Sequence, residues 1–334
     1  LASAEKFVQE VFWRTYWKGW LHRRPAIWDR YRRDLDRDRA ACAVKPLYQK
    51  AITAETPLRC FNAWSRELVE TGYLHNHARM WFASIWVFTL KLPWTLGADF
   101  FLRHLLDGDA ASNTLGWRWV AGLQTRGKHY VASPANVAKF TDSRLGEGES
   151  FARSPEPLQE DEPLPPTNDV SPVPPPAAIG PNTGLLLTDD DWRAFEALPG
   201  TGALTAIAGV MPGPEYAALG IEPRVADFRR ALGVEVLTGL SAKLLDDRDP
   251  AAAVSAWARA NGLRTVLAAE PAVGLWSRLW PETVAALEGA GIEVRPFRRP
   301  WDDAFYPHAT HGFFRLKKHI PEVVNRAGFL PVSG

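Results

Sequence analysis

The sequence predicts an all-helical domain followed by a smaller α/β domain of Rossmann-like type. In the first part of the chain, apolar residues recur at intervals of three and four, which is typical of helices that bury one face. In the last part, short apolar runs alternate with helical stretches, which is typical of a parallel sheet. The expected domains are a helical domain over 1–147, a Pro-rich acidic linker over 148–182 and an α/β domain over 183–325.

Four helices are expected in the first part, and Gly72, Pro93 and Gly108 stand at suitable ends for them. Their predicted ranges are 4–21, 57–71, 75–90 and 96–106. Ten prolines lie between residues 151 and 181, where most other residues are acidic or small. Such a composition cannot bury a core and favours an extended chain.

The last part of the chain is expected to form five strands and three helices. The predicted strands cover 185–187, 204–210, 234–237, 265–269 and 292–294, and the predicted helices cover 225–232, 250–261 and 281–290. Ligands of parallel sheets bind beyond the carboxyl ends of the strands. We therefore expect any ligand of this domain near residues 269–274 and 296–300.

The composition describes a globular protein of 334 residues, with 46% hydrophobic and 23% charged residues. The longest apolar run, from Met80 to Leu90, is too short to span a membrane. Two cysteines provide no disulfide framework, so we expect a reducing compartment and a cytoplasmic location. We also expect a monomer. The chain opens with Leu1 in polar helical sequence, and we expect it to be a truncated form or a mature fragment.

Tryptophan and charge are unevenly distributed. Ten of the 15 tryptophans precede residue 150, and the net charge of +1 combines +7 for residues 1–150 with −4 for 151–181 and −2 for the remainder. An anionic partner is therefore expected for the first part only. The basic loop 126–129 is the better candidate for phosphate contact, because the arginines between Arg30 and Arg39 alternate with acidic residues and are expected to form a solvated helical face.

The stretch from Thr71 to Trp119 contains several motifs at fixed spacing: TGYLHNHARM, a Trp before a helix, and DGDAASNTLGWRW. This stretch resembles the flavin-binding helical domain of the DNA photolyase and cryptochrome family. An upstream segment, FVQEVFWRTYWKGW, matches the family's Glu placed three residues before a Trp-Arg pair. The resemblance covers about residues 1–145 and implies FAD as cofactor and damaged DNA, single or double stranded, as partner.

An arginine and a carboxylate on successive helices, Arg79 and Asp107, can form a bidentate pair suited to a buried site, or an ordinary salt bridge between helices. The resemblance places this pair against the flavin ring and Asn113 at its reactive nitrogen. Arg14 and Asp109 are the further cofactor-binding residues that it implies.

The resemblance assigns Trp94 and Trp117 to a chain of tryptophans that carries an electron from the surface to the flavin. No third tryptophan stands at the family's usual position, which falls near Ala41. Trp64, Trp81 and Trp86 are possible substitutes, although a tryptophan on an apolar helix more often belongs to the core.

A lesion inside a duplex must be flipped out of the stack to reach a buried cofactor. Five residues match the family's substrate pocket: Trp13 and Trp119 as its walls, and Glu10, Asn76 and Met80 as further contacts. In six-four photolyases, histidines stand at the positions of Asn76 and Met80, so the resemblance implies cyclobutane pyrimidine dimers as substrate. The alternative is a cryptochrome-like photoreceptor without repair activity, and Asn113 favours repair because plant photoreceptors typically have Asp there.

Several departures from the family pattern affect binding. His77 replaces an Arg that contacts substrate, which removes a permanent charge near DNA. The upstream family motif that contacts the flavin phosphates is absent. The α/β domain follows the helical domain rather than preceding it, so we expect a permuted or replaced antenna domain with a second chromophore of unknown identity. His308 and His311 lack accompanying ligands, and no metal site is expected.

Overall fold

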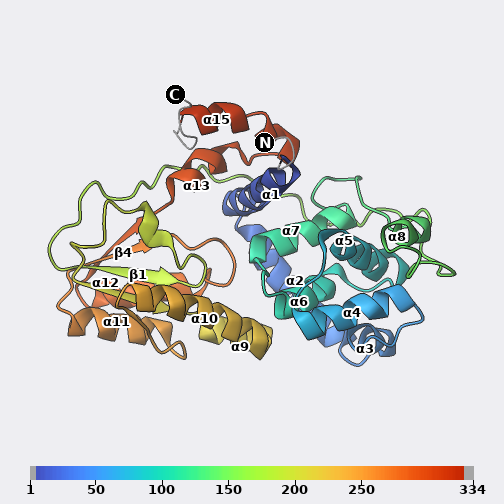
Figure 1. The fold of residues 1–334 in the computed structure, drawn as a ribbon, viewed down its shortest axis with the longest axis horizontal. Helices are drawn as coiled ribbons and strands as arrows, with labels where there is room; N and C mark the ends of the chain where they lie inside the picture. The colour runs from blue at the N-terminus through green and yellow to red at the C-terminus, as the bar shows by residue number, and fades with distance from the viewer. Residues whose placement is uncertain (1–4, 327–334) are drawn as a thin grey trace. The chain divides into compact units, whose positions relative to one another are not determined.

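A computed structural model describes residues 5–326 of the chain, and these residues form two compact units (Figure 1). The helical unit consists of residues 26–165 with the short segment 221–225. The α/β unit consists of residues 5–25, 166–220 and 226–326. Each unit is described by itself. The two fold types expected from the sequence, one helical and one with a parallel sheet, are both present.

The helical unit contains no strand among its described residues. Its helices are α2 (Ala26–Cys42), α3 (Pro46–Ile52), α4 (Arg59–Thr71), α5 (Asn76–Ser84), η2 (Ile85–Thr89), α6 (Trp94–His104), α7 (Ala110–Ala121) and α8 (Pro134–Phe140). Helix α4 ends at Gly72, whose φ of 72° is the left-handed conformation that glycine adopts without strain. The loop after Gly72 then leads directly into α5, which positions the first candidate site residues.

The helix expected over 75–90 changes its winding part-way. Helix α5 ends at Ser84, and η2 continues it as one π-helical turn in which Leu90 N donates to the carbonyl of Ile85. Leu92 N then donates to the carbonyl of Trp86, and the indole NH of Trp86 donates to Pro93 O. The single π-turn therefore ends the helix that began with α5, and the bonds of Leu92 and Trp86 fix the short connection to α6.

Five parallel strands form the sheet of the α/β unit, in the order β3-β2-β1-β4-β5. Their bounds are β1 (Thr183–Thr188), β2 (Ala206–Val210), β3 (Lys243–Leu244), β4 (Thr265–Ala269) and β5 (Glu293–Phe297). Alternate residues of β2 face opposite layers. Ala208 belongs to the core that contains Val254 and Leu287, whereas a Cβ on Gly209 would meet Leu237 and Trp192. Both faces are therefore covered, as parallel sheets require.

Helices α9 to α12 lie beside this sheet, and further short helices follow β5 in the chain (Figure 1). Their bounds are η3 (Ala194–Ala197), α9 (Gly213–Leu219), α10 (Pro223–Gly239), α11 (Pro250–Ala260), α12 (Leu279–Gly289), α13 (Pro300–Phe305), η4 (Tyr306–His308), α14 (Phe313–Lys317) and α15 (Ile320–Arg326). The strand expected over 234–237 is wrong, because these residues lie inside α10. The strand beside β2 is the two-residue β3 instead.

The first helix of the chain, α1 (Glu5–His22), belongs to the α/β unit. The ring of Phe12 stacks on Trp301 at 5.1 Å between centroids, and Tyr16 Oη donates to the carbonyl of His311 at 2.7 Å. A Cβ on Gly19 would lie 2.8 Å from the ring of Tyr306, so α1 approaches η4 too closely for a larger residue. These contacts join the start of the described chain to helices near its end.

The Pro-rich segment 151–182 contains no helix or strand, as its composition predicts. Its two parts are nevertheless fixed by hydrogen bonds. Leu158 N donates to Ala121 O within the helical unit. Val173 N donates to the carboxylate of Asp303 at 3.0 Å within the α/β unit. The segment is therefore an ordered extended chain that adheres to each unit in turn.

Candidate functional site

The expected pair of Arg79 and Asp107 forms between α5 and the loop before α7. The guanidinium donates to both carboxylate oxygens, at 3.1 and 3.2 Å, and its Nε donates to the carbonyl of Leu74 at 2.8 Å. The side chains are 25% and 48% exposed respectively, so of the two alternatives left open by the sequence, a pair in a buried site or an ordinary salt bridge, the exposure is that of the second. A pair at such exposure contributes about 1 kcal/mol or less to stability. Its polar atoms can therefore also hydrogen-bond a ligand with little loss of stability.

The loop between α6 and α7 ends at Asp109, which caps α7. Its carboxylate accepts from Ser112 N at 2.7 Å, and this satisfies one of the free amides of the first turn. One turn further, Asn113 is buried, and its amide nitrogen donates to Ala98 O on α6 at 2.7 Å. Asp109 and Asn113 therefore fix the start of α7 against α6, and Asp107 lies immediately before them.

Trp117 lies in the aromatic core between α5, η2 and α6. Its ring meets Phe101 at 5.1 Å and Trp86 at 6.1 Å, in both cases edge to face, and it is 3% exposed. A Cβ on Gly97 would lie only 2.2 Å from the ring. Gly97 is therefore required in α6 because the indole occupies the space where a side chain would stand.

Four polar side-chain groups of α7 are buried without a hydrogen-bond partner among the described residues. They are the hydroxyls of Ser112 and Thr114, the indole NH of Trp117 and the Nε of Arg118. Nearly all buried polar groups in proteins have a partner, so unpaired ones indicate a binding site or bound water. The group expected from the resemblance, FAD, carries ring nitrogens, carbonyls and hydroxyls that could pair with such donors. The residues present therefore fit it.

Trp94, the other expected electron carrier, begins α6 and is half-buried. Its ring centroid lies 5.6 Å from that of Tyr31, and the guanidinium of Arg118 lies 5.8 Å from it. Trp94 and Trp117 make no direct ring contact with each other. Tyr31, which the sequence did not single out, is buried with no hydrogen-bond partner for its hydroxyl among residues 5–326, and burial raises its pKa well above the usual value.

Three of the expected substrate residues lie in the helical unit. Asn76 is exposed at the first position of α5, and Met80 is half-buried one turn later on the same helix. Trp119 is half-buried on α7, and its ring stacks with Tyr130 at 6.1 Å. The ring of His77 lies between those of Trp81 and Phe140, at 5.9 and 5.6 Å. The nearby loop 126–128 is exposed, as phosphate contact would require.

The other expected substrate and cofactor residues lie on α1, in the α/β unit. Glu10 and Arg14 are exposed there. Trp13 is half-buried, and its ring stacks on Phe313 of α14 at 3.9 Å between centroids with an interplanar angle of 15°. One face of the Trp13 ring is therefore already covered by the chain itself. The structure does not bring these three residues together with the helical-unit residues within one compact unit.

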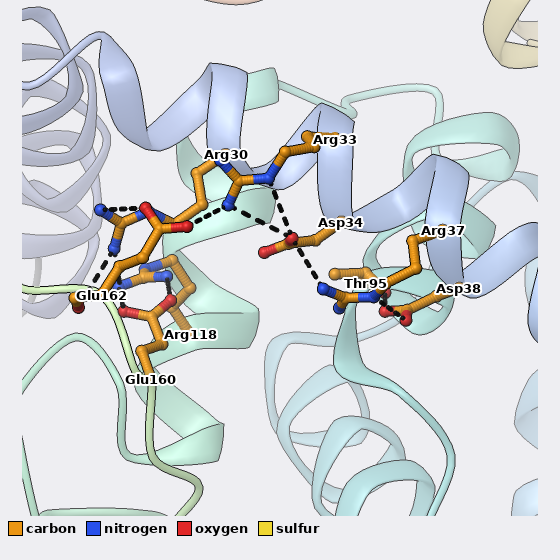
Figure 2. Close-up of polar contacts among 9 residues, drawn as sticks. All are labelled: Arg30, Arg33, Asp34, Arg37, Asp38, Thr95, Arg118, Glu160 and Glu162. Carbon is orange, nitrogen blue, oxygen red and sulfur yellow. Dashed lines mark hydrogen bonds and ion pairs between the residues drawn. The ribbon is translucent and has the colours of Figure 1, made fainter.

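The sequence interpretation missed an ion-pair network on α2 and α7 (Figure 2). Arg118, between Trp117 and Trp119, is 1% exposed and pairs through both terminal nitrogens with Glu160. Arg30 is also buried and lies 3.1 Å from the carboxylate of Glu162. The expectation that the arginines of α2 form a plain solvated face is therefore wrong for Arg30. The sequence feature that could have indicated this network is the acidic run 160–162, whose charge is opposite to that of the arginines on α2.

The carboxyl edge of the sheet, where a second ligand was expected, is filled by paired side chains. Arg298, directly after β5, pairs with Glu270, directly after β4, and with Asp303. Arg299 pairs with Asp191 beyond β1. Among residues 5–326, no three His, Cys, Asp or Glu side chains are arranged to hold a metal ion. None of the described helices is long and apolar enough to span a membrane.

Residues 7–146 match the family model described as the FAD binding domain of DNA photolyase. The match covers less than half of the chain, so it shows a likeness of this region to that domain. It is similar to deoxyribodipyrimidine photo-lyases from Streptomyces griseus, with 38% identity over 144 residues, and from Thermus thermophilus, with 36% identity over 124 residues. These matches cover 42% and 36% of this chain, but only 31% and 29% of the relatives. No solved structure matches the chain.

Proposed function

We propose that the protein binds FAD and uses blue light to repair cyclobutane pyrimidine dimers in DNA. The observation that carries this proposal is the coincidence of two features in residues 7–146. This region matches a photolyase FAD-binding domain, and its helix α7 carries buried polar groups without partners among the described residues, while Asp107, shortly before α7, pairs with Arg79. The relatives named as deoxyribodipyrimidine photo-lyases support the reaction.

The cofactor residues on α5 and α7 divide into anchoring and tuning roles. Arg79 and Asp107, whose geometry is fixed by their mutual hydrogen bonds, would hold the flavin ring. Asn113 presents a neutral amide, which hydrogen-bonds the ring without supplying a proton. Asp109 keeps α7 capped, and Arg14 contributes a cation. FAD, when bound, supplies the light-driven electron, and the protein supplies position and electrostatics.

The substrate residues hold a dimer that has been flipped out of the DNA stack. Trp13 and Trp119 provide aromatic walls, and Glu10 and Asn76 provide hydrogen-bonding groups. Met80 provides an adaptable apolar contact. Neither Asn76 nor Met80 can act as the acid that a histidine would be, which favours cyclobutane dimers over six-four products. Trp94 and Trp117 are the residues that would carry electrons from a reductant in solution to a bound flavin.

The test is repair of dimer-containing single-stranded and double-stranded DNA by the full chain loaded with FAD. We expect thymine absorbance to recover under blue light and to stay constant in the dark. Trp117→Phe should slow photoreduction of the bound flavin while leaving the amount of bound flavin unchanged. Intact photoreduction without any repair would overturn the assignment as a repair enzyme. Loss of flavin from Trp117→Phe would show that Trp117 serves packing instead.

A further inference from the structure

A cleft of about 280 Å³ lies in the helical unit between α2 and an extended acidic segment, residues 158–163, which we call the acidic strap. Three arginines of α2 line it, together with the half-buried ring of Trp94. Figure 2 shows Arg30 and Arg33 pointing towards the strap, whereas Arg37 is directed along α2 to Asp34 and Asp38. The cleft therefore combines cations, an aromatic wall, the acidic strap and two carboxylates of α2, those of Asp34 and Asp38.

Glu162 is the residue of the strap that engages the two forward arginines. Its carboxylate lies 2.5 Å from Arg33 and 3.1 Å from Arg30, and Arg30 also donates to the carbonyl of Pro163 at 3.0 Å. The carboxylate thus sits where two guanidinium groups converge. Convergent guanidinium groups with planar forks are the arrangement that recognises phosphate oxygens.

The ion pairs of Glu160 and Glu162 with the arginines of α2 and α7 differ in how easily they exchange. Arg118 and Glu160 are 1% and 18% exposed, so their separation would leave a buried charge without a partner. Arg33 and Glu162 are 58% and 49% exposed, and ion pairs at such positions contribute little. Glu160 therefore holds the strap in place. When Glu162 leaves its arginines, the strap stays anchored, and the buried Arg30 keeps a carboxylate partner because Glu160 lies 3.7 Å from it.

We propose that Arg30 and Arg33 form, beside Trp94, a binding site for the phosphate of single-stranded nucleic acid, and that Glu162 occupies the phosphate position in the free protein. Arginines that bind the backbone next to an aromatic ring are the usual chemistry of single-strand binding. The site requires neither flavin nor a lesion, so it goes beyond the proposed repair function. Glu162 acts as an internal competitor that lowers the affinity for the strand.

The experiment measures fluorescence anisotropy of a labelled, undamaged oligothymidylate with the full chain in the dark. Glu162→Gln is compared with Asp161→Asn, because Asp161 is adjacent in the strap and takes no part in the ion pairs with Arg30 and Arg33. Both variants remove one negative charge. We expect Glu162→Gln to bind about threefold to tenfold more tightly than Asp161→Asn, with an affinity that falls as salt rises.

Arg33→Gln, added to Glu162→Gln, should abolish this gain, because it removes the exposed arginine that Glu162 releases. Competition by free thymidine monophosphate distinguishes a nucleic-acid strand from a mononucleotide as the source of the phosphate. If the site binds a strand, the mononucleotide should displace the labelled oligothymidylate only weakly. Full displacement would overturn the assignment to a strand. Equal affinities of Glu162→Gln and Asp161→Asn, with circular dichroism showing both variants folded, would overturn the competitor role. Because binding is measured without light or lesion, failure of repair leaves this result unaffected.

Discussion

Replacing Gly97 by alanine tests how tightly α6 and α7 pack at the candidate flavin site. The new Cβ would lie 2.2 and 2.3 Å from two ring atoms of Trp117, whereas carbon atoms rest at about 3.5–4.0 Å. The ring must therefore move by more than about 1 Å, although Phe101 and Trp86 pack against it. Overpacking costs about 1–3 kcal/mol or more, against a gain of about 1 kcal/mol in helix propensity. The expected net loss is about 2 kcal/mol.

The matched control is Gly116→Ala, because Gly116 also lies inside a helix and a Cβ there would meet nothing within 4 Å. We expect this control to be neutral or to stabilise by up to about 1 kcal/mol. Urea unfolding of the full chain, followed by far-ultraviolet circular dichroism and tryptophan fluorescence, gives both midpoints. A Gly97→Ala protein as stable as Gly116→Ala would refute the tight contact between Gly97 and Trp117.

Two further predictions concern buried charge. Glu160→Gln removes the partner of Arg118, which is 1% exposed. This change should lower the free energy of unfolding, measured by urea titration, by about 3 kcal/mol. An unchanged urea midpoint would contradict the role of this pair. Burial raises the pKa of Asp302 to about 6, so the folded protein holds a costly charge above that pH, whereas below about pH 3 the group is protonated in both states. Asp302→Asn should therefore raise the thermal midpoint at about pH 8, by up to about 3 kcal/mol in stability, and leave it unchanged near about pH 3. The same shift at both pH values would argue against this titration.

The sequence predicted the fold types well where a local pattern decides the structure. β4 and the helices around it follow from apolar runs and turn residues. Residues 234–237 were misassigned because Gly233 looked like a helix end and the β-branched residues after it looked like a strand. In the structure the ring of Trp192 fills the space beside Gly233, where a Cβ would lie 2.6 Å from it. Tertiary packing therefore keeps this glycine inside α10.

Motif spacing identified Arg79, Asp107 and Asn113 as candidates, and it was wrong in placing Asp107 on a helix, because this residue lies in the loop between α6 and α7. Motif spacing does not report contacts between segments far apart in the chain. Trp13 stacks on Phe313, which lies 300 residues later, and no local pattern could reveal that partner. The same holds for Arg118 and Glu160, because a buried ion pair depends on where the Pro-rich segment lies after folding.

Titration of the folded, full-length chain with FAD tests the central claim most directly, because every proposed step depends on a flavin site formed by α5 and α7. We expect binding of one FAD per chain, with Asp107→Asn weakening it because Arg79 loses its carboxylate partner. Glu67→Gln on α4 is a suitable control for the loss of an acidic charge outside the site. A folded chain that binds no FAD, or an affinity that Asp107→Asn leaves unchanged, would contradict the account.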